Sequence, residues 1–269
     1  MKLRNRLAAP IRLATFCSSK ARRLRMNGDV SWYLSRKGVL SNWRLEMLRG
    51  RHWGKRCFLI GNGPSLKTMD LRPLANEFTI GLNRVYLLFD EIGFATTYYV
   101  CVNKLVVEQC AEEIVRVPAI KFINWNARDL IPFTRDMILL RPLFHPHFSK
   151  DLTVGMWEGS TVTYVAMQVA HHLGFDQVIL VGVDHDYQAE GPPNLEVVSQ
   201  GDDPDHFAPN YFAKGFRWQL PDLYRSEIAY RIAKLAFEQD NREIVDATVG
   251  GKLEIFRKVS YETLIDSGG

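Results

Sequence analysis

The chain of 269 residues is 46% apolar and 24% charged, which is typical of a globular protein long enough to bury a substantial core. It has no run of about eighteen apolar residues, so we expect no transmembrane helix. The four cysteines, at positions 17, 57, 101 and 110, are not spaced as zinc ligands or as a disulfide framework, and we expect a cytoplasmic protein.

Positive charge is concentrated at the front of the chain. Residues 1–56 hold fifteen of the 34 Lys and Arg residues but only two of the 30 Asp and Glu residues, which gives net charges of +13 for this part and −9 for the remainder. The same part is rich in aromatic residues, including Trp32, Tyr33, Trp43 and Trp53. We therefore expect residues 1–54 to form a basic, aromatic N-terminal helical extension.

Two interpretations of this extension remain open. Cations near an anionic bilayer gain about 1 kcal/mol each and indole rings favour the headgroup zone, which predicts a peripheral protein at the inner face of the cytoplasmic membrane, bound through residues 1–50. Alternatively, the segment is a helical collar whose aromatic side chains pack on the main domain. A nucleic-acid partner is not expected, because the basic run is terminal rather than spread over a folded face.

From Lys55 onward, short apolar runs alternate with helical patterns, as in parallel sheets whose faces are both covered. The fold expected for residues 55–269 is therefore α/β, a Rossmann-like mainly parallel sheet with helices on both faces. Residues 185–221 lack clear periodicity and are expected to form a long lid insertion. Strands are predicted near residues 56–60, 78–82, 97–102, 119–124, 137–141, 177–183 and 243–247, and helices near 85–92, 104–115, 159–173 and 222–238.

The first strand leads into the loop Gly61-Asn62-Gly63-Pro64-Ser65-Leu66. Open α/β sheets bind ligands at the carboxyl ends of their strands, and glycines let backbone amides approach a phosphate. The loop is not a Walker motif, because no Gly-Lys-Ser/Thr follows, and Leu66 replaces the third glycine of a dinucleotide fingerprint. It predicts Gly61, Asn62, Gly63 and Ser65 as the phosphate-facing part of a nucleotide site; the alternative is a plain connecting turn.

Polar residues at later strand and helix ends extend this predicted site. Asn83 and Asn103 each follow a predicted strand, and an amide side chain can both donate to and accept from ribose hydroxyls and base edges. Ser160 and Thr161 precede an apolar helix, where they can cap the helix, contact a phosphate, or do both.

The most apolar predicted strand ends in Gly182-Val183-Asp184-His185-Asp186-Tyr187, the richest polar cluster of the chain. Asp184 and Asp186 are spaced as in an Asp-x-Asp motif, which can hold Mg²⁺ against a diphosphate through oxygen ligands. The alternative is that both carboxylates anchor the loop.

Within the expected lid, residues 205–218 are aromatic and basic. His206 is a candidate general base near neutral pH, and Lys214 or Arg217 a candidate for neutralising a leaving phosphate. The alternative is a surface flap whose aromatic side chains pack on the body.

Taken together in this order, the loop at Gly61, Gly81-Leu82-Asn83-Arg84, the Gly182 cluster and the lid resemble the 6-hydroxymethylpterin diphosphokinase-like family, whose relatives include flagellin-modifying motility accessory factors. More remotely, the chain is similar to bacterial lipooligosaccharide sialyltransferases. That resemblance implies donor binding by Asn62, Gly63, Ser65, Asn83, Asn103, Ser160 and Thr161, with Tyr187 near the donor phosphate and His206 as base. Glu158-Gly159-Ser160-Thr161 reverses the order of the small residues in the sialyltransferase pattern.

Three functional hypotheses follow. The first is a glycosyltransferase that moves a sugar from a nucleotide donor, such as a CMP-linked acidic sugar, to a cell-surface glycan or its lipid-linked precursor, without a required cofactor. The second is a diphosphokinase acting on a pterin alcohol with ATP, in which Asp184 and Asp186 hold Mg²⁺. The third is a non-catalytic nucleotide- or glycan-binding component of an envelope assembly complex.

Overall fold

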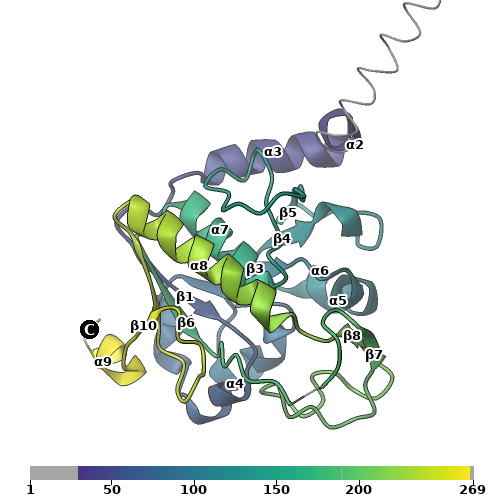
Figure 1. Ribbon diagram of the computed structural model, residues 1–269. Helices are drawn as coiled ribbons and strands as arrows, with labels where there is room; N and C mark the ends of the chain where they lie inside the picture. Colours follow the sequence, from purple (N-terminus) through teal and green to yellow (C-terminus); the bar gives the residue numbers. More distant parts are fainter. Residues whose placement is uncertain (1–29, 189, 267–269) are drawn as a thin grey trace, which may run out of the picture.

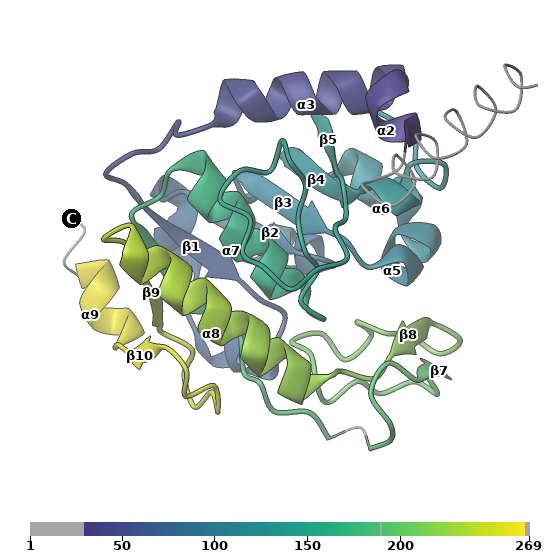
Figure 2. The ribbon, with the colours of Figure 1, turned by 45° about the horizontal axis from the view of Figure 1, so that its top comes forward.

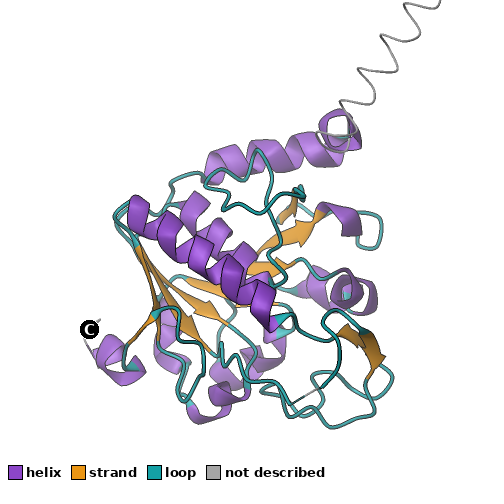
Figure 3. Cartoon of the chain, viewed as in Figure 1, coloured by secondary structure: helices purple, strands orange, loops and turns teal. Residues whose placement is uncertain are grey.

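A central sheet of eight strands, all paired in parallel, organises the computed structural model, which describes residues 30–188 and 190–266 (Figures 1 and 3). The strand order is β10-β9-β6-β1-β2-β3-β4-β5. The fold is therefore the expected Rossmann-like α/β fold. The strands are β1 (Arg56–Ile60), β2 (Thr79–Leu82), β3 (Tyr98–Cys101), β4 (Ile120–Asn124), β5 (Met137–Leu140), β6 (Gln177–Val181), β9 (Glu243–Asp246) and β10 (Arg257–Lys258).

The order in which the chain adds strands to the sheet changes side between β1 and β6, although all strands remain parallel. From β1 the chain adds β2 to β5 on one side, then returns to add β6, β9 and β10 on the other. The register pairs Arg56 with Gln177 and Ile60 with Val181, so the carboxyl ends of β1 and β6 lie level. In open α/β sheets, this switch point is where a crevice for ligands forms.

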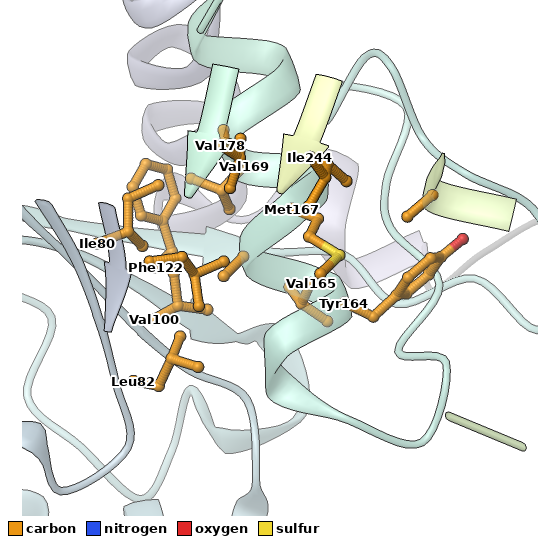
Figure 4. Packing of buried hydrophobic residues seen from close by; sticks show 14 of the residues in the cluster. Ile80, Leu82, Val100, Phe122, Tyr164, Val165, Met167, Val169, Val178 and Ile244 are labelled. Atoms are coloured by element: carbon orange, nitrogen blue, oxygen red, sulfur yellow. The ribbon is translucent and has the colours of Figure 1, made fainter. Parts of the chain in front are cut away.

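Alternate side chains of each strand enter two apolar cores, one on each face of the sheet. Helices α7 (Val162–Leu173) and α8 (Leu223–Gln239) cover one face. Figure 4 shows Tyr164, Val165 and Met167 of α7 packed beside the strands in this core. The other face is covered by the short elements η1 (Pro64–Thr68), η2 (Arg72–Asn76), η3 (Val85–Leu88), α4 (Phe89–Ile92), α5 (Lys104–Gln109) and α6 (Ala111–Arg116).

Helix boundaries differ from the predicted ones where local backbone geometry interrupts the pattern. Residues 85–92 form a 3₁₀ turn followed by one α-helical turn, and the predicted helix 104–115 is divided at Cys110. Helix α7 begins at Val162 because Gly159 and Ser160 have φ values of +58° and +63°, outside the right-handed helical region.

Helices α2 (Val30–Leu34) and α3 (Arg36–Leu48) lie along the β5 edge of the sheet (Figure 2). Leu45 is fully buried, the hydroxyl of Ser41 accepts a hydrogen bond from the Leu139 amide at 3.0 Å, and Trp32 packs edge-on against Trp125 at 5.1 Å. Residues 30–48 therefore pack on the body as a collar, while residues 1–29 lie outside the described part. Among the helices described, none has the length and apolarity needed to cross a membrane.

The lid is ordered by packing rather than by long secondary structure. It contains one antiparallel pair, β7 (Glu196–Val198) with β8 (Arg217–Gln219), and it is followed by α8. Phe207, Tyr211 and Phe212 are buried in the core on the α5 side of the sheet. The last two elements described are strand β10 and helix α9 (Tyr261–Asp266).

Candidate functional site

Two hollows adjoin at the carboxyl edge of the sheet, beside the switch point. The inner pocket has a volume of about 100 Å³ and lies among the loops after β1 and β6, the start of α7 and His206. The outer groove, of about 660 Å³, runs between α5, the start of α7 and the lid. Both are lined by Asn83, Thr161, Val162, Tyr187 and His206, so they form one cleft.

The Gly61 loop packs against the end of β6 through most of its amides. Gly61 donates to a β6 carbonyl at 2.8 Å and Gly63 to the Gly182 carbonyl at 2.9 Å, while the Ser65 amide donates to Asp184 Oδ1 at 3.0 Å and the Ser65 hydroxyl to Oδ2 at 2.7 Å. The amides of Gly61, Gly63 and Ser65 are thus already hydrogen-bonded within the protein, and binding of a phosphate by this loop stays a prediction. Gly61 and Gly63 line the inner pocket, whereas Ser65 is bound to Asp184.

The glycine at position 63 is required by Asp184. A Cβ atom there would lie 1.8 Å from Asp184 Oδ2, closer than atoms can approach. Burial raises the pKa of the Asp184 carboxyl, against the lowering effect of the Ser65 hydrogen bonds. This carboxylate therefore occupies the position at the loop where an anionic ligand was expected.

Asn62 and Asn83 bring two buried acceptor oxygens to the lining of the inner pocket. The side-chain oxygen of each is buried and has no hydrogen-bond partner among the described residues. Both residues line the inner pocket, and the Asn62 carbonyl also accepts from the lid amide of Phe207 at 3.0 Å. A buried acceptor without a partner costs about 1–3 kcal/mol, so these two oxygens point to a ligand that donates hydrogen bonds.

Asparagines end four neighbouring strands, β1 to β4: Asn62, Asn83, Asn103 and Asn124. All four line the cleft. Asn103 Oδ1 caps α5 by accepting from Leu105 at 2.9 Å, so its capping role is observed. The sequence analysis missed Asn124, although the repetition of asparagine at consecutive strand ends was a usable signal.

Asn124 holds a half-buried carboxyl, that of Glu158, in the outer groove. Its side-chain nitrogen donates to Glu158 Oε1 at 2.9 Å, and burial raises the pKa of Glu158. Next to it, Thr161 caps α7: its hydroxyl accepts from the Thr163 amide at 3.3 Å and meets the Tyr230 hydroxyl at 3.2 Å. The α7 N-terminus, with its partial positive charge, faces the cleft where Ser160, Thr161 and Val162 line it.

His206 has the geometry of an oriented base. Its Nδ1 lies 2.8 and 2.9 Å from the two carboxylate oxygens of Asp203, and its ring stacks on Tyr211 at 4.0 Å with an interplanar angle of 3°. Asp203 also accepts from the Phe212 amide at 3.1 Å, which fixes the carboxylate. An Nδ1–H bonded to a carboxylate leaves Nε2 as the unprotonated nitrogen of the neutral ring, and His206 lines both parts of the cleft.

The two acidic residues predicted as metal ligands have separate partners. Asp184 is bound by Ser65, and Asp186 pairs with Lys252 at 2.8 Å. No group of three His, Cys, Asp or Glu side chains within residues 30–188 and 190–266 is arranged to hold a metal ion. Asp184 and Asp186 thus act as loop anchors in this structure, and an Mg²⁺ site formed by them with a bound diphosphate stays a prediction. Tyr187, the third residue of this cluster, lines both parts of the cleft and is 39% exposed.

The lid contributes Arg217 rather than Lys214 to the cleft. Lys214 is exposed and lines neither hollow, so the structure does not bring it to the other site residues. Arg217 lines the outer groove and pairs with Glu108 at 2.9 Å and Glu196 at 3.4 Å. Its backbone is held by the Gln109 side chain, which donates to its carbonyl and accepts from its amide, both at 2.8 Å. These bonds fasten the lid to α5.

Non-glycine residues with positive φ, a strained backbone conformation, are concentrated around the cleft. Five described non-glycine residues have positive φ, and four of them line it: Asn83, Ser160, His185 and Asn194. Such conformations cost about 1–3 kcal/mol each and persist where the surroundings hold them, commonly at functional sites. The cleft thus combines oriented amides, a helix N-terminus, a carboxylate-bound histidine and a strained rim, which is a set suited to binding a phosphorylated ligand and moving one proton.

No protein-family model and no curated protein matches the sequence. The MAf glycosyltransferase from Magnetospirillum magneticum AMB-1 has a similar structure, with a TM-score of 0.50 and 16% identity over 83% of this chain. The match spans 38% of that longer protein. At this identity the likeness concerns the fold alone.

Two sialyltransferase structures give weaker matches. CstII from Campylobacter jejuni, solved in complex with a substrate analogue, cytidine-5′-monophosphate, has a TM-score of 0.36 and 14% identity, covering 77% of this chain and 86% of its own. A mammalian sialyltransferase solved with Gal-beta-1-3GalNAc-ortho-nitrophenol has a TM-score of 0.40 and 12% identity, covering 84% and 82%.

Proposed function

We propose that this protein is a glycosyltransferase that transfers a sugar from a nucleotide donor to a hydroxyl group of a glycan or its lipid-linked precursor. The observation that carries the proposal is the His206–Asp203 pair, held by the lid over a cleft at the switch point of the sheet. The fold shared with the Magnetospirillum glycosyltransferase supports the same class of reaction.

The donor fits the cleft with its nucleoside at the asparagines and its phosphate at the start of α7. The unpartnered oxygens of Asn62 and Asn83 accept hydrogen bonds from ribose hydroxyls or a base amine, and Asn103 offers its side-chain nitrogen. The α7 N-terminus and the Tyr187 hydroxyl stabilise a phosphate. Because these groups carry no full positive charge, they suit a donor with one phosphate, such as a CMP-linked acidic sugar.

In the proposed reaction, His206 Nε2 removes the proton from the acceptor hydroxyl as the oxygen attacks the anomeric carbon. The bond between that carbon and the donor phosphate oxygen breaks, and the nucleotide leaves with the bonding electron pair, which inverts the configuration. Asp203 stabilises the imidazolium that forms. The α7 N-terminus stabilises the negative charge that develops on the leaving phosphate.

The acceptor belongs in the outer groove, on the lid side. Trp218 lines this groove and is stacked on Phe212 at 5.2 Å, which holds the indole as a platform for a sugar ring. Glu108, Glu158 and Glu196 surround the groove and accept hydrogen bonds from sugar hydroxyls. Arg217, which pairs with Glu108 and Glu196, can donate to sugar hydroxyls from the same groove.

A thermal-shift panel with CMP, CDP, UDP, GDP and ATP, each with Mg²⁺ or EDTA, tests the proposal. Tm is expected to rise with CMP to the same extent under both conditions, because the phosphate contacts are a helix N-terminus and a tyrosine. A rise with ATP that requires Mg²⁺ would instead support a diphosphokinase. No rise with any nucleotide would contradict the proposed donor site.

A further inference from the structure

Helix α3 is apolar on its outer face as well as on the face that packs against β5. Its inner face buries Gly38, Ser41, Leu45 and Leu48. On the opposite side, Val39, Trp43 and Met47 recur every four residues and are 55%, 60% and 62% exposed. Just before α3, Tyr33 and Leu34 are 54% and 80% exposed. We call these five residues the outer α3 surface. Contiguous exposed apolar side chains on the outer side of a helix commonly mark a contact surface.

The outer α3 surface lies in the part of the chain that holds the excess positive charge. Residues 1–56 have a net charge of +13 and the remainder −9. Arg36 is exposed next to this surface, and Arg51 and Lys55 are exposed beyond the end of α3. Within residues 30–56, seven Lys and Arg residues and one Glu give a net charge of +6. This charge favours an anionic partner for the surface that holds the exposed apolar side chains.

An apolar groove of about 270 Å³ opens beside the surface. Its lining combines apolar side chains of α3 with Ile120 and Ile138 of the neighbouring strands, and includes one carboxylate, Asp136, which pairs with Lys121. Arg135 stands at this groove and is exposed. Exposed tryptophan, aliphatic side chains and guanidinium groups together match the interface of a bilayer, where apolar groups enter the acyl boundary and cations remain among the headgroups.

We propose that the outer α3 surface docks on an anionic lipid bilayer and holds the protein there as a peripheral protein. A second copy of this chain is a poorer occupant, because a two-fold contact through this surface would bring two strongly basic segments together. The inference is independent of the proposed transferase activity, since it depends only on α2, α3 and the charge around them.

Co-sedimentation of the full chain with lipid vesicles tests whether the outer α3 surface binds an anionic bilayer. Vesicles of phosphatidylcholine alone are compared with vesicles containing about one-third phosphatidylserine, at low and high salt. We expect binding to the anionic vesicles that decreases with salt. The triple variant Val39→Glu/Trp43→Glu/Met47→Glu is expected to bind them more than tenfold more weakly, because it both removes apolar contacts and adds negative charge.

The matched control is Tyr224→Glu/Leu235→Glu/Val249→Glu, which adds the same charge at exposed apolar residues outside α3. It is expected to bind the vesicles within about threefold of the unaltered chain, and both variants are expected to keep its Tm because the replaced side chains are exposed. Equal binding by the α3 variant and the unaltered chain would overturn the proposal. So would a failure of the unaltered chain to bind, or a dimer that the α3 changes abolish without any effect on vesicle binding.

Discussion

Replacing Asp203 with asparagine tests how the lid holds its base. The Asp203 carboxylate accepts from His206 Nδ1 at 2.8 Å, from the Phe212 amide at 3.1 Å and from the Asp205 amide at 3.2 Å. The carboxylate offers two acceptor oxygens, whereas an asparagine side chain offers one. With two backbone amides on opposite oxygens, the introduced NH₂ group must face at least one donor in either orientation.

Both orientations weaken the pair. Each Asp203 oxygen accepts from one backbone amide and lies within 2.9 Å of His206 Nδ1, so the introduced NH₂ group opposes a backbone donor in either orientation. The remaining oxygen is neutral, so it no longer stabilises the imidazolium that forms when His206 takes the proton. Loss of a hydrogen bond to a charged group costs about 1.5–3 kcal/mol of unfolding free energy. Loss of a general base lowers the rate about 10²- to 10⁴-fold.

The assay is kcat for sugar transfer from a nucleotide donor, with donor Kd measured by calorimetry. Asp203→Asn is expected to lower kcat at least about a hundredfold and to change donor Kd little, because Asp203 lines neither hollow of the cleft. Asp202→Asn is the matched control: it removes the same charge from the adjacent, exposed residue and should leave kcat unchanged. A folded Asp203→Asn variant with kcat within twofold of the unaltered enzyme would refute the assignment of His206 as an oriented base.

Three further predictions concern residues elsewhere in the structure. Asn62→Ala should weaken nucleotide binding, measured by calorimetry, about tenfold or more without lowering Tm. Asn42 also has a buried oxygen without a partner, but it lies outside the cleft, so Asn42→Ala should leave nucleotide binding unchanged. Gly63→Ala should lower the free energy of unfolding in urea by about 2–3 kcal/mol, because the added Cβ atom meets Asp184. The loss should be clearly smaller when Asp184 is also replaced by alanine. Equal losses in the two backgrounds would show that the Asp184 contact is not the reason for the glycine. Burial lowers the pKa of His171 from 6.5 to about 4. As the pH falls, His171 therefore becomes protonated in the unfolded chain before it does in the folded protein. About 3 kcal/mol of the free energy of unfolding should be lost between pH 6.5 and pH 4. His171→Gln should make urea-unfolding free energy less dependent on pH over that range, and an unchanged dependence would contradict this.

The strands of the sheet could be predicted from the sequence because each is a short apolar run, and such runs can be recognised from neighbouring residues alone. All seven predicted strands exist with ends within two residues of the expected ones. Among the described residues, only the two-residue strand β10 and the short pair β7 and β8 in the lid were not predicted. Short helices were less predictable, since a single backbone angle at Cys110 divides one and positive φ at Ser160 delays another.

The site could be predicted as a location but not as a set of partners. Strand ends place Asn62, Asn83 and Asn103 at one edge in any parallel sheet of this order. The bonds from Ser65 to Asp184 join residues 119 positions apart, and their register depends on how β1 and β6 pair. For the same reason, no local pattern distinguishes Lys214, which lies outside the cleft, from Arg217, which lines it.

The central claim is that the cleft binds a nucleotide-linked sugar and that His206 activates the acceptor. The most direct measurement is nucleotide release from a panel of nucleotide-linked sugars, including a CMP-linked acidic sugar, with and without a glycan acceptor, for the unaltered enzyme and His206→Ala. We expect acceptor-dependent release from one donor that falls at least about a hundredfold in His206→Ala, while calorimetry still detects binding of that donor. Equal release by His206→Ala and the unaltered enzyme would contradict the account, as would the absence of both binding and release across the panel.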